Sequence, residues 1–407
     1  MNIKAIITGS IYIVALALFG SNIYLGNIKI SNDITQPLGT SYSVLAAVDE
    51  RKPAEYYVYG FIPYWTLHQA EHMQVEKLTD IAYFALQINA DGTIRQYNDE
   101  GFYEPGYNNW RDNEELDKLI AKSKASGTRF ALTIISHEDD VTYEFLDCRD
   151  CWDVLLKDII EELNFRGISN INMDFELVEQ DSAEGYNLKY SQLVNFLNNR
   201  LDGYYGDSFV VTSTLPDSAY RPRITDITSL SKASDALFVM AYDFHRPTSD
   251  KAGPVAPING AGIHAEYDIA TMLEDYLTLA PQNKLILGVP YYGYNWLVDG
   301  GEPKAERIPG DDVLGYSISQ TYEDIADTRL EFNPEVLWDI EGQVPYFTYF
   351  NPEKGTTRQV YYENKDSLRA KYALAKTNDL AGVGIWALGY DGGYQELWEL
   401  LAEEFIY

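Results

Sequence analysis

Short apolar runs and longer amphipathic segments alternate along the chain from residue 56 onward. The short runs are rich in β-branched and aromatic residues, which is typical of buried strands. Eight runs have this pattern: Tyr57–Ile62, Asp80–Gln87, Arg129–Ile135, Ser169–Glu176, Ser208–Ser213, Asp235–Tyr242, Lys284–Pro290 and Ala381–Ala387. Helical periodicity is found between most of them and near the end of the chain: Asn113–Ser126, Trp152–Asn164, Lys189–Leu201, Tyr267–Leu279, Lys365–Thr377 and Gln395–Glu404. Eight strands joined by crossover segments, with no glycine fingerprint after the first strand, predict an α/β fold of the (β/α)8 TIM-barrel type rather than a doubly wound sheet.

The seventh and eighth predicted strands are about 90 residues apart, which is far longer than an ordinary crossover. We interpret Asn295–Val360 within this gap as an inserted small α+β lobe at the active face of a barrel that spans residues 56–407. This lobe and the loop Asn89–Arg111 are expected to set the shape of the cleft at that face.

The first residues of the chain have the pattern of an export signal. A short basic start, Met1–Lys4, precedes the apolar stretch Ala5–Gly20. After Lys4, the next charged residue is Lys29. The apolar core suits a cleaved signal peptide, and the whole uncharged stretch is long enough for a signal anchor. We therefore predict a signal peptide or anchor at residues 1–28, a polar linker at 29–55, and a protein that is secreted or held on the outer face of the cell membrane.

Charge excludes several classes of partner. The 407 residues include 31 Lys and Arg against 62 Asp and Glu, for a formal net charge of −31. An acidic surface without a basic tract repels nucleic acid and anionic lipid, so membrane contact is expected only through the N-terminal segment. The 33 Tyr and 7 Trp residues either pack in the barrel or present rings to the flat faces of sugars. The oligomeric state is open, and we expect a monomer.

The segment Gly167–Glu176, GISNINMDFE, carries the candidate chemistry. In a strand, side chains alternate between faces, so Asn172, Asp174 and Glu176 share one face and the apolar residues between them share the other. In a barrel the polar face points inward at the carboxyl end of the strand, where barrel enzymes place their active sites. Repulsion between two acids and partial burial should raise one pKa and create a proton donor near neutral pH. The alternative is a buried polar network without catalysis.

This segment resembles the D-x-x-D-x-D-x-E signature of the family 18 glycoside hydrolases. It is most similar to the N-I-D-F-E version of bacterial cell-wall and spore-cortex N-acetylglucosaminidases. The four signature positions are Ser169, Asn172, Asp174 and Glu176. Ser169 departs from the usual first Asp, and this departure is expected to remove an inner support of the acid pair.

Other segments resemble the same family in order and spacing. They are Gly60–Trp65 for the first strand, Phe238–Asp243 for the sixth, Leu287–Gly293 for the seventh, and Tyr361–Leu368 with Gly382–Gly389 for the approach to the eighth strand and the strand itself. The resemblance extends from about residue 56 to the end of the sequence given.

The resemblance implies substrate-assisted retaining hydrolysis of β-1,4 bonds beside N-acetylglucosamine, in chitin or peptidoglycan. It implies that Glu176 is the general acid and base, that Asp174 orients the substrate's acetamide and offsets positive charge, and that the Tyr242 hydroxyl binds the acetamide. Further substrate contacts are expected from Asn172, Met240, Asp243, Trp386 and Tyr292. No cofactor or metal is implied. The alternative from another class is a chitinase-like lectin that binds the glycan without cleaving it, although such relatives typically replace the acid that Glu176 retains.

Two cysteines, Cys148 and Cys151, form a C-x-x-C motif. In an exported protein this motif predicts a local disulfide, with a redox pair or half of a zinc site as alternatives. The segment His68–His72 reads H-Q-A-E-H, the inverted zinc-peptidase pattern, but it lies in a short connection where we expect a solvated loop or short helix. His137 and His245 follow the third and sixth predicted strands, so each could line the cleft or lie behind it.

Overall fold

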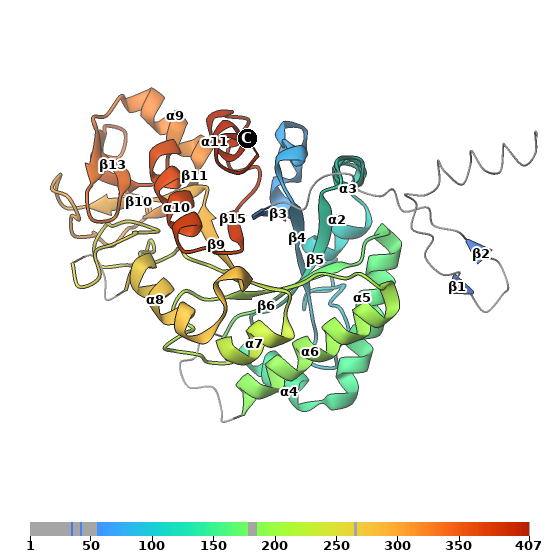
Figure 1. Cartoon of the computed structure of the whole chain (residues 1–407). Coiled ribbons are helices and arrows are strands. Elements are labelled where there is room, and N and C mark those ends of the chain that lie inside the picture. Colours follow the sequence, from blue (N-terminus) through green and yellow to red (C-terminus); the bar gives the residue numbers. More distant parts are fainter. Residues whose placement is uncertain (1–33, 36–40, 43–54, 178–184, 264–266, 407) are drawn as a thin grey trace, which may run out of the picture. The chain divides into compact units, whose positions relative to one another are not determined.

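The computed structural model describes residues 34–35, 41–42, 55–177, 185–263 and 267–406 (Figure 1). The chain divides into two units, Met1–Ala54 and Glu55–Tyr407. In the first unit, strands β1 (Ile34–Thr35) and β2 (Ser41–Tyr42) pair antiparallel. The predicted signal segment lies outside the described residues, as does most of the predicted linker. No helix among the residues described has the length and apolarity needed to cross a membrane.

Eight parallel strands of the second unit close into a barrel in the order β15-β3-β4-β5-β6-β7-β8-β9. The strands are β3 (Tyr57–Pro63), β4 (Asp80–Gln87), β5 (Arg129–Ser136), β6 (Asn170–Phe175), β7 (Val210–Thr214), β8 (Ala236–Val239), β9 (Leu285–Pro290) and β15 (Gly382–Trp386). Every predicted strand is present, so the predicted (β/α)8 barrel is confirmed.

The sixth barrel strand is shorter than predicted. We expected it to run to Tyr242, but β8 ends at Val239. The backbone N–H groups of Ala241 and Tyr242 donate to the carbonyls of Val239 and Met240, two residues back along the chain. Those N–H groups cannot also pair with a neighbouring strand, so the backbone leaves the sheet just where the candidate side chains begin.

Helices and short 3₁₀ segments connect the strands and cover the outside of the barrel (Figure 1). They are η1 (Tyr64–His72), η2 (Val75–Lys77), α2 (Pro105–Arg111), α3 (Glu114–Ser126), α4 (Asp139–Asp147), α5 (Arg149–Arg166), α6 (Tyr186–Tyr205), α7 (Ile227–Ala233), α8 (Ile269–Leu279), η3 (Gln282–Lys284), α10 (Lys365–Thr377) and α11 (Glu396–Phe405). Helix α3 shows how local sequence sets the boundaries. The Asn113 side chain accepts hydrogen bonds from the first N–H groups, and Gly127 ends the helix in the left-handed conformation.

Aromatic side chains fill the barrel interior. The rings of Phe61 and Phe238 meet edge to face with centroids 4.8 Å apart. A Cβ atom on Gly384 would lie 2.2 Å from the Phe238 ring, so glycine is needed there for this packing. The space beside Gly384 in the eighth barrel strand is therefore taken by Phe238.

A five-stranded antiparallel sheet is inserted between β9 and β15, where the α+β lobe was expected. Its strands are ordered β11-β10-β14-β13-β12, and α9 follows β11. Their bounds are β10 (Tyr292–Val298), β11 (Ile318–Thr321), α9 (Tyr322–Phe332), β12 (Val336–Asp339), β13 (Val344–Asn351) and β14 (Thr356–Tyr361). The sheet starts at Tyr292 rather than Asn295. Because β10 follows β9 after one residue, the start of the lobe lies next to the barrel's carboxyl end.

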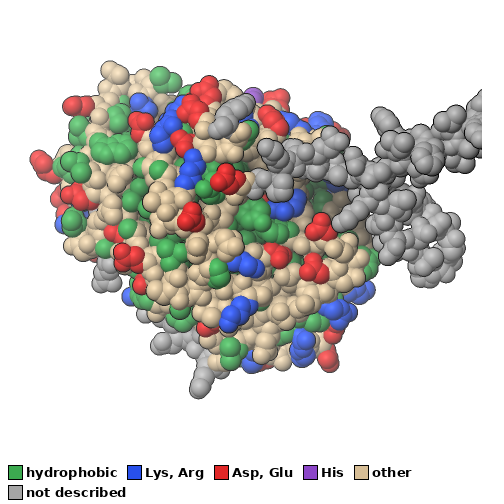
Figure 2. Space-filling model, viewed as in Figure 1, with side chains coloured by type: hydrophobic (Ala, Val, Ile, Leu, Met, Phe, Trp, Pro, Cys, Tyr) green, Lys and Arg blue, Asp and Glu red, His purple; other side chains and the backbone are tan. Residues whose placement is uncertain are grey.

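A disulfide joins Cys148 and Cys151 at the junction of α4 and α5. Gly92 packs directly on this turn, since a Cβ at that position would lie 2.2 Å from the carbonyl oxygen of Cys151. The turn therefore links the loop after β4 to the start of α5. On the face shown in Figure 2, Lys and Arg side chains are interspersed with Asp and Glu rather than gathered into one basic patch.

Candidate active site

A cavity of about 230 Å³ opens at the carboxyl end of the barrel. It is lined by residues from, or directly after, six barrel strands, together with the first residue of the inserted lobe. The lining residues are Phe84, His137, Asp174, Glu176, Leu215, Pro216, Met240, Tyr242, Asp243, Arg246, Tyr292 and Trp386. This is the end of the barrel at which such folds place their chemistry.

The alternation of β6 directs the two acids into this cavity. On the opposite face, the Phe175 ring stacks on Tyr190 of α6 with centroids 5.1 Å apart, which anchors the strand to its covering helix. Glu176 lies one residue beyond the strand, but its backbone N–H donates to the carbonyl of Ser136 on β5 at 3.1 Å. The Asp174 side chain is 4% exposed and that of Glu176 is 33% exposed. One acid is therefore withdrawn from water, while the other reaches it.

Burial raises the pKa of Asp174 well above its usual range, and the charge of Glu176 raises it further. Among the residues that the structure describes, Asp174 Oδ1 has no hydrogen-bond partner. The sequence led us to expect one raised pKa in this pair, and it is the pKa of the buried acid that is raised. The resemblance assigns proton donation to the other acid, so a mechanism must account for both facts.

Tyr242 is buried beside the acids. Its pKa is raised well above the usual range, first by burial and then by the charges of Asp174 and Asp243. The hydroxyl therefore keeps its proton at physiological pH and can donate a hydrogen bond into the cavity. Met240, partly buried, lines the same wall.

Asp243 is held by residues of the inserted lobe. Its backbone is left-handed, with φ of 63°. The hydroxyls of Tyr292 and Tyr294 both donate to Asp243 Oδ1, the second at 2.6 Å, while Oδ2 lies 3.7 Å from Arg246 Nε. These contacts orient a carboxylate at the cavity wall and join the start of β10 to the segment after β8.

Trp386 is the last residue of β15 and lines the cavity from the side of the first barrel strands. Its ring centroid lies 4.7 Å from that of Phe84 and 5.6 Å from that of Phe61. These aromatic neighbours hold the indole in place, while part of the side chain remains exposed. A held, partly exposed indole is suited to stacking against the apolar face of a sugar.

Two residues of the acidic signature do not reach the cavity. Asn172 is fully buried, and its amide exchanges hydrogen bonds of 3.2 Å with the Ser213 hydroxyl on β7, so it contacts a neighbouring strand and does not line the cavity. The Ser169 hydroxyl donates to the carbonyl of Asp207 at 3.4 Å, before β6 begins at Asn170. Ser169 therefore lies at the opposite end of the strand from the acid pair, and its effect on those acids stays a prediction.

The histidines divide between the cavity and the surrounding structure. His137 lines the cavity, whereas His245 is buried and its Nδ1 lies 2.8 Å from the carbonyl oxygen of Pro254. His68 and His72 of the H-Q-A-E-H segment are exposed on η1. This segment forms the short solvated helix that we expected.

Four lining residues were not foreseen: Phe84, Leu215, Pro216 and Arg246. Leu215 and Pro216 directly follow the fifth barrel strand, so their place after a predicted strand was a usable signal. Phe84 lies within a predicted strand, but the pairing of β4 with β5 shifts register between Tyr83 and Leu86. Simple alternation fails at such an irregularity.

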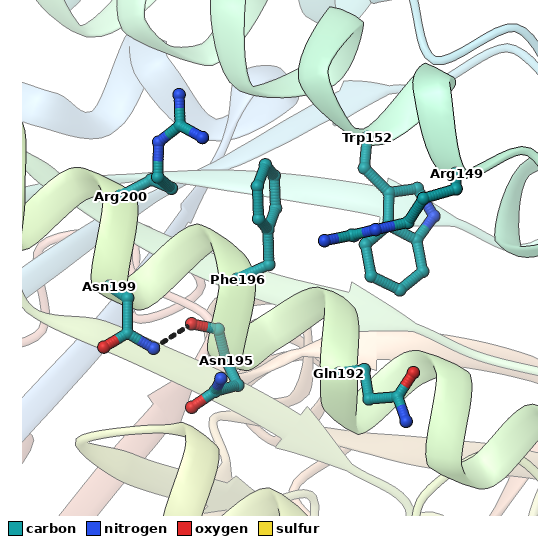
Figure 3. A pocket seen from close by; sticks show the side chains of 7 residues that line it. All are labelled: Arg149, Trp152, Gln192, Asn195, Phe196, Asn199 and Arg200. Carbon is teal, nitrogen blue, oxygen red and sulfur yellow. Dashed lines mark hydrogen bonds between the residues drawn. The ribbon is translucent and has the colours of Figure 1, made fainter.

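A second, larger hollow of about 410 Å³ lies on the outside of the barrel between α5 and α6. We call it the outer groove. In it the Arg149 guanidinium lies 3.9 Å from the centroid of the Trp152 ring and 4.6 Å from that of Phe196 (Figure 3). The other lining residues are Gln192, Asn195, Asn199 and Arg200.

Comparisons with known proteins agree with the barrel fold. The model of the glycosyl hydrolases family 18 matches residues 57–391. The probable di-N-acetylchitobiase 1 of Dictyostelium discoideum is 26% identical over 308 residues, covering 70% of this chain and 76% of the relative. The cortical fragment-lytic enzyme of Bacillus anthracis is 24% identical over 338 residues, covering 81% of this chain and 68% of the relative. The crystal structure of the spore cortex-lytic enzyme SleL of Bacillus megaterium QM B1551 has a TM-score of 0.68 at 20% identity, covering 91% of this chain and 79% of that one.

The chain therefore belongs to the glycosyl hydrolases family 18. It is a glycoside hydrolase, and the family resemblance of its motifs is confirmed.

Proposed function

We propose that the protein hydrolyses the β-1,4 bond that follows an N-acetylglucosamine unit, by the substrate-assisted retaining route. The observation that carries this proposal is the convergence of Asp174, Glu176, Tyr242 and Trp386 on one cavity. A sugar held there would meet a stacking ring, a hydroxyl donor and two acids together. The match to the family model, which includes all of these residues, supports the same reaction.

Glu176 acts first as an acid and then as a base. It protonates the glycosidic oxygen while the carbonyl oxygen of the substrate's own acetamide attacks C1. The C1–O bond to the leaving sugar breaks, and a C1–O bond to the acetamide forms, which gives a cyclic oxazolinium ion. Glu176 then removes a proton from water, whose oxygen adds to C1 and opens the ring with retention. The proton taken from water returns Glu176 to the acid form that the next cycle needs, and the partial exposure of its side chain leaves room for that water.

Asp174 and Tyr242 stabilise the intermediate rather than attack it. In the free enzyme burial favours the protonated form of Asp174. Positive charge developing on the oxazolinium ring favours the carboxylate instead, whose proton passes to water in the cavity, so the interaction strengthens in the transition state. The protonated hydroxyl of Tyr242 holds the acetamide oxygen for attack on C1.

We further propose that peptidoglycan, rather than chitin, is the preferred polymer. The support is the match to the cortical fragment-lytic enzyme, which extends over 81% of this chain. The chitobiase relative supports the N-acetylglucosamine unit itself.

Peptidoglycan lies outside the cell membrane, so the proposal includes export of the protein. The apolar segment Ala5–Gly20 and the disulfide support export. Fractionation of cells expressing the full chain tests this: recovery of the protein only in the cytosol would contradict export.

The decisive experiment compares wild type with Glu176→Gln on purified peptidoglycan and on chitooligosaccharides. We expect wild type to release reducing ends, Glu176→Gln to bind the same glycans without cleaving them, and the surface control Glu161→Gln to behave as wild type. Mass spectrometry of the products separates peptidoglycan from chitin and endo from exo action. If wild type binds both polymers as tightly as Glu176→Gln does and cleaves neither, the chain is a lectin and the proposal is wrong.

A further inference from the structure

Three potential metal ligands from two adjacent strand ends face one another across the active-site cavity. His137 Nε2 lies 3.7 Å from Glu176 Oε1 and 4.0 Å from Asp174 Oδ2. One ligand atom of each residue lies within 4.8 Å of the other two. We propose that these three side chains form a binding site for a first-row divalent metal ion of the Zn²⁺ type, and that the bound ion inhibits the enzyme. Inhibition rests on the proposed function, whereas metal binding does not.

Two of the three separations are near those of an ion of this size, and the third, between the two acids, is at most 4.8 Å and has to shorten when an ion binds. Zn²⁺ binds histidine nitrogen and carboxylate oxygen at roughly 2.0–2.2 Å, so two ligands in tetrahedral geometry lie about 3.4 Å apart. The two distances from His137 exceed this value by a few tenths of an ångström, which small side-chain rotations can remove. Because all three residues line a cavity of about 230 Å³, there is space for an ion and for water at its remaining positions.

The buried acid gives an independent reason to expect a cation. Asp174 is almost completely buried and lines the cavity, yet its Oδ1 accepts no hydrogen bond from any residue that the structure describes. A buried carboxylate normally needs a hydrogen-bond donor or a cation to offset the loss of water. A metal ion that replaces the proton on Asp174 would provide that charge and would allow both acids to be ionised side by side.

The donor set selects among metal ions. One imidazole and two carboxylates suit zinc, nickel, cobalt or copper, whereas Mg²⁺ and Ca²⁺ prefer sites built from oxygen alone. The ion would occupy the oxygen of Glu176 that must carry the catalytic proton, and it would place a positive charge where the oxazolinium ion forms. It is therefore an inhibitor in this proposal and not a cofactor.

The other zinc-like pattern of the chain is the alternative location. His68, Glu71 and His72 are exposed on η1. Among the described residues, His137, Asp174 and Glu176 are the one set of three or more such side chains close enough to share an ion. The exposed histidines therefore serve as matched controls.

Calorimetric titration of Zn²⁺ into full-length protein without a histidine tag, treated beforehand with a chelator, tests the site. We expect one ion per chain, with affinity at least tenfold weaker in His137→Ala and in Glu176→Gln and unchanged in His72→Ala. Glu176→Gln keeps the shape of the side chain, so it decides the matter if His137→Ala folds poorly. The proposal is overturned if wild type binds no Zn²⁺, or if binding is weakened by His72→Ala and not by the cavity variants.

Hydrolysis assays then test the consequence. Zn²⁺ should inhibit wild type, excess chelator should restore its activity, and Mg²⁺ at the same concentration should have no effect. Metal binding without inhibition of an active enzyme would contradict the inhibitory role. If no glycan is cleaved under any condition, the proposed function fails, while calorimetry still reports whether the metal site exists.

Discussion

The active-site cavity and the outer groove differ in the polar groups that line them, and the reactive groups lie in the smaller of the two. The outer groove is the larger, at about 410 Å³ against about 230 Å³. Its polar groups are amides and guanidinium groups, and Arg149 already lies against two aromatic rings (Figure 3). In the cavity, by contrast, two acids at the end of β6, one of them buried with a raised pKa, meet a protonated tyrosine that follows β8. Convergence of polar groups withdrawn from water, rather than volume, distinguishes a site of chemistry.

The largest effect should come from Glu176→Gln, which removes the only proton-transfer group assigned to the reaction. General acid–base catalysis contributes roughly 10²–10⁴-fold, and here one residue serves in both steps, so we expect kcat to fall by at least about 10³-fold. Steady-state hydrolysis of a soluble N-acetylglucosamine oligomer measures this. Gln192→Ala in the outer groove should stay within about twofold of wild type. Similar losses of kcat in Glu176→Gln and Gln192→Ala would contradict the conclusion that the reaction takes place in the cavity and not in the outer groove.

Asp174→Asn should slow the reaction and stabilise the fold. The pKa of Asp174 is raised in the folded state, so that state binds more protons than the unfolded chain. The stability of wild type should therefore decrease as pH rises from about 4, the usual range of an unfolded Asp, towards the raised pKa. We expect Asn at this position to add roughly 1–3 kcal/mol near pH 7 and to lose that advantage near pH 4, while activity falls by about 10²-fold.

Thermal unfolding of Asp174→Asn and wild type across this pH range shows whether the substitution raises or lowers the stability of the fold. Asp243→Asn is the matched control, because Asp243 accepts hydrogen bonds from Tyr292 and Tyr294 and its carboxylate should stabilise the fold. An Asp174→Asn protein that is less stable than wild type at pH 7 would show that the buried acid is not a strained group.

Trp386→Ala should weaken substrate binding more than it slows chemistry. Loss of a stacking surface costs about 1.5–3 kcal/mol, which corresponds to a rise in KM of roughly 10- to 100-fold. Titration of glycan against the Glu176→Gln background measures binding without turnover. Trp338→Ala, an exposed tryptophan of β12 outside the cavity, should leave binding unchanged. If Trp338→Ala weakened glycan binding more than Trp386→Ala, the ring that stacks on the sugar would belong to the inserted lobe instead of the cavity.

The smallest effect is expected from Arg149→Ala in the outer groove. Its contacts with Trp152 and Phe196 are cation–π contacts at an exposed site, worth about 0.5–1 kcal/mol of stability. Denaturant unfolding should detect this small loss, and kcat/KM should not change. A clear fall in activity on polymer, but not on short oligomers, would instead make the outer groove a second glycan contact.

Much of the fold and the acid pair could be predicted because both depend on local pattern. Strand residues alternate with period two, so the segment Ser169–Glu176 placed Asp174 and Glu176 on one face without further information. Asn172 was correctly assigned to the same face. Its contact with Ser213 could not be predicted, because that contact depends on how far Asn172 lies from the carboxyl end of the barrel. The alternation of side chains also did not predict the register shift of β4 or the early end of β8, because both depend on backbone hydrogen bonds.

By itself, then, the sequence determined the order of strands and helices, the class of the fold and the two acids, because periodicity and spacing act over a few residues. Only the tertiary structure decided which acid is withdrawn from water, that His137 faces the pair, and that the inserted lobe holds Asp243 through two tyrosines. Burial and charge–charge distances arise when segments far apart in the chain meet, and a linear pattern does not contain those distances.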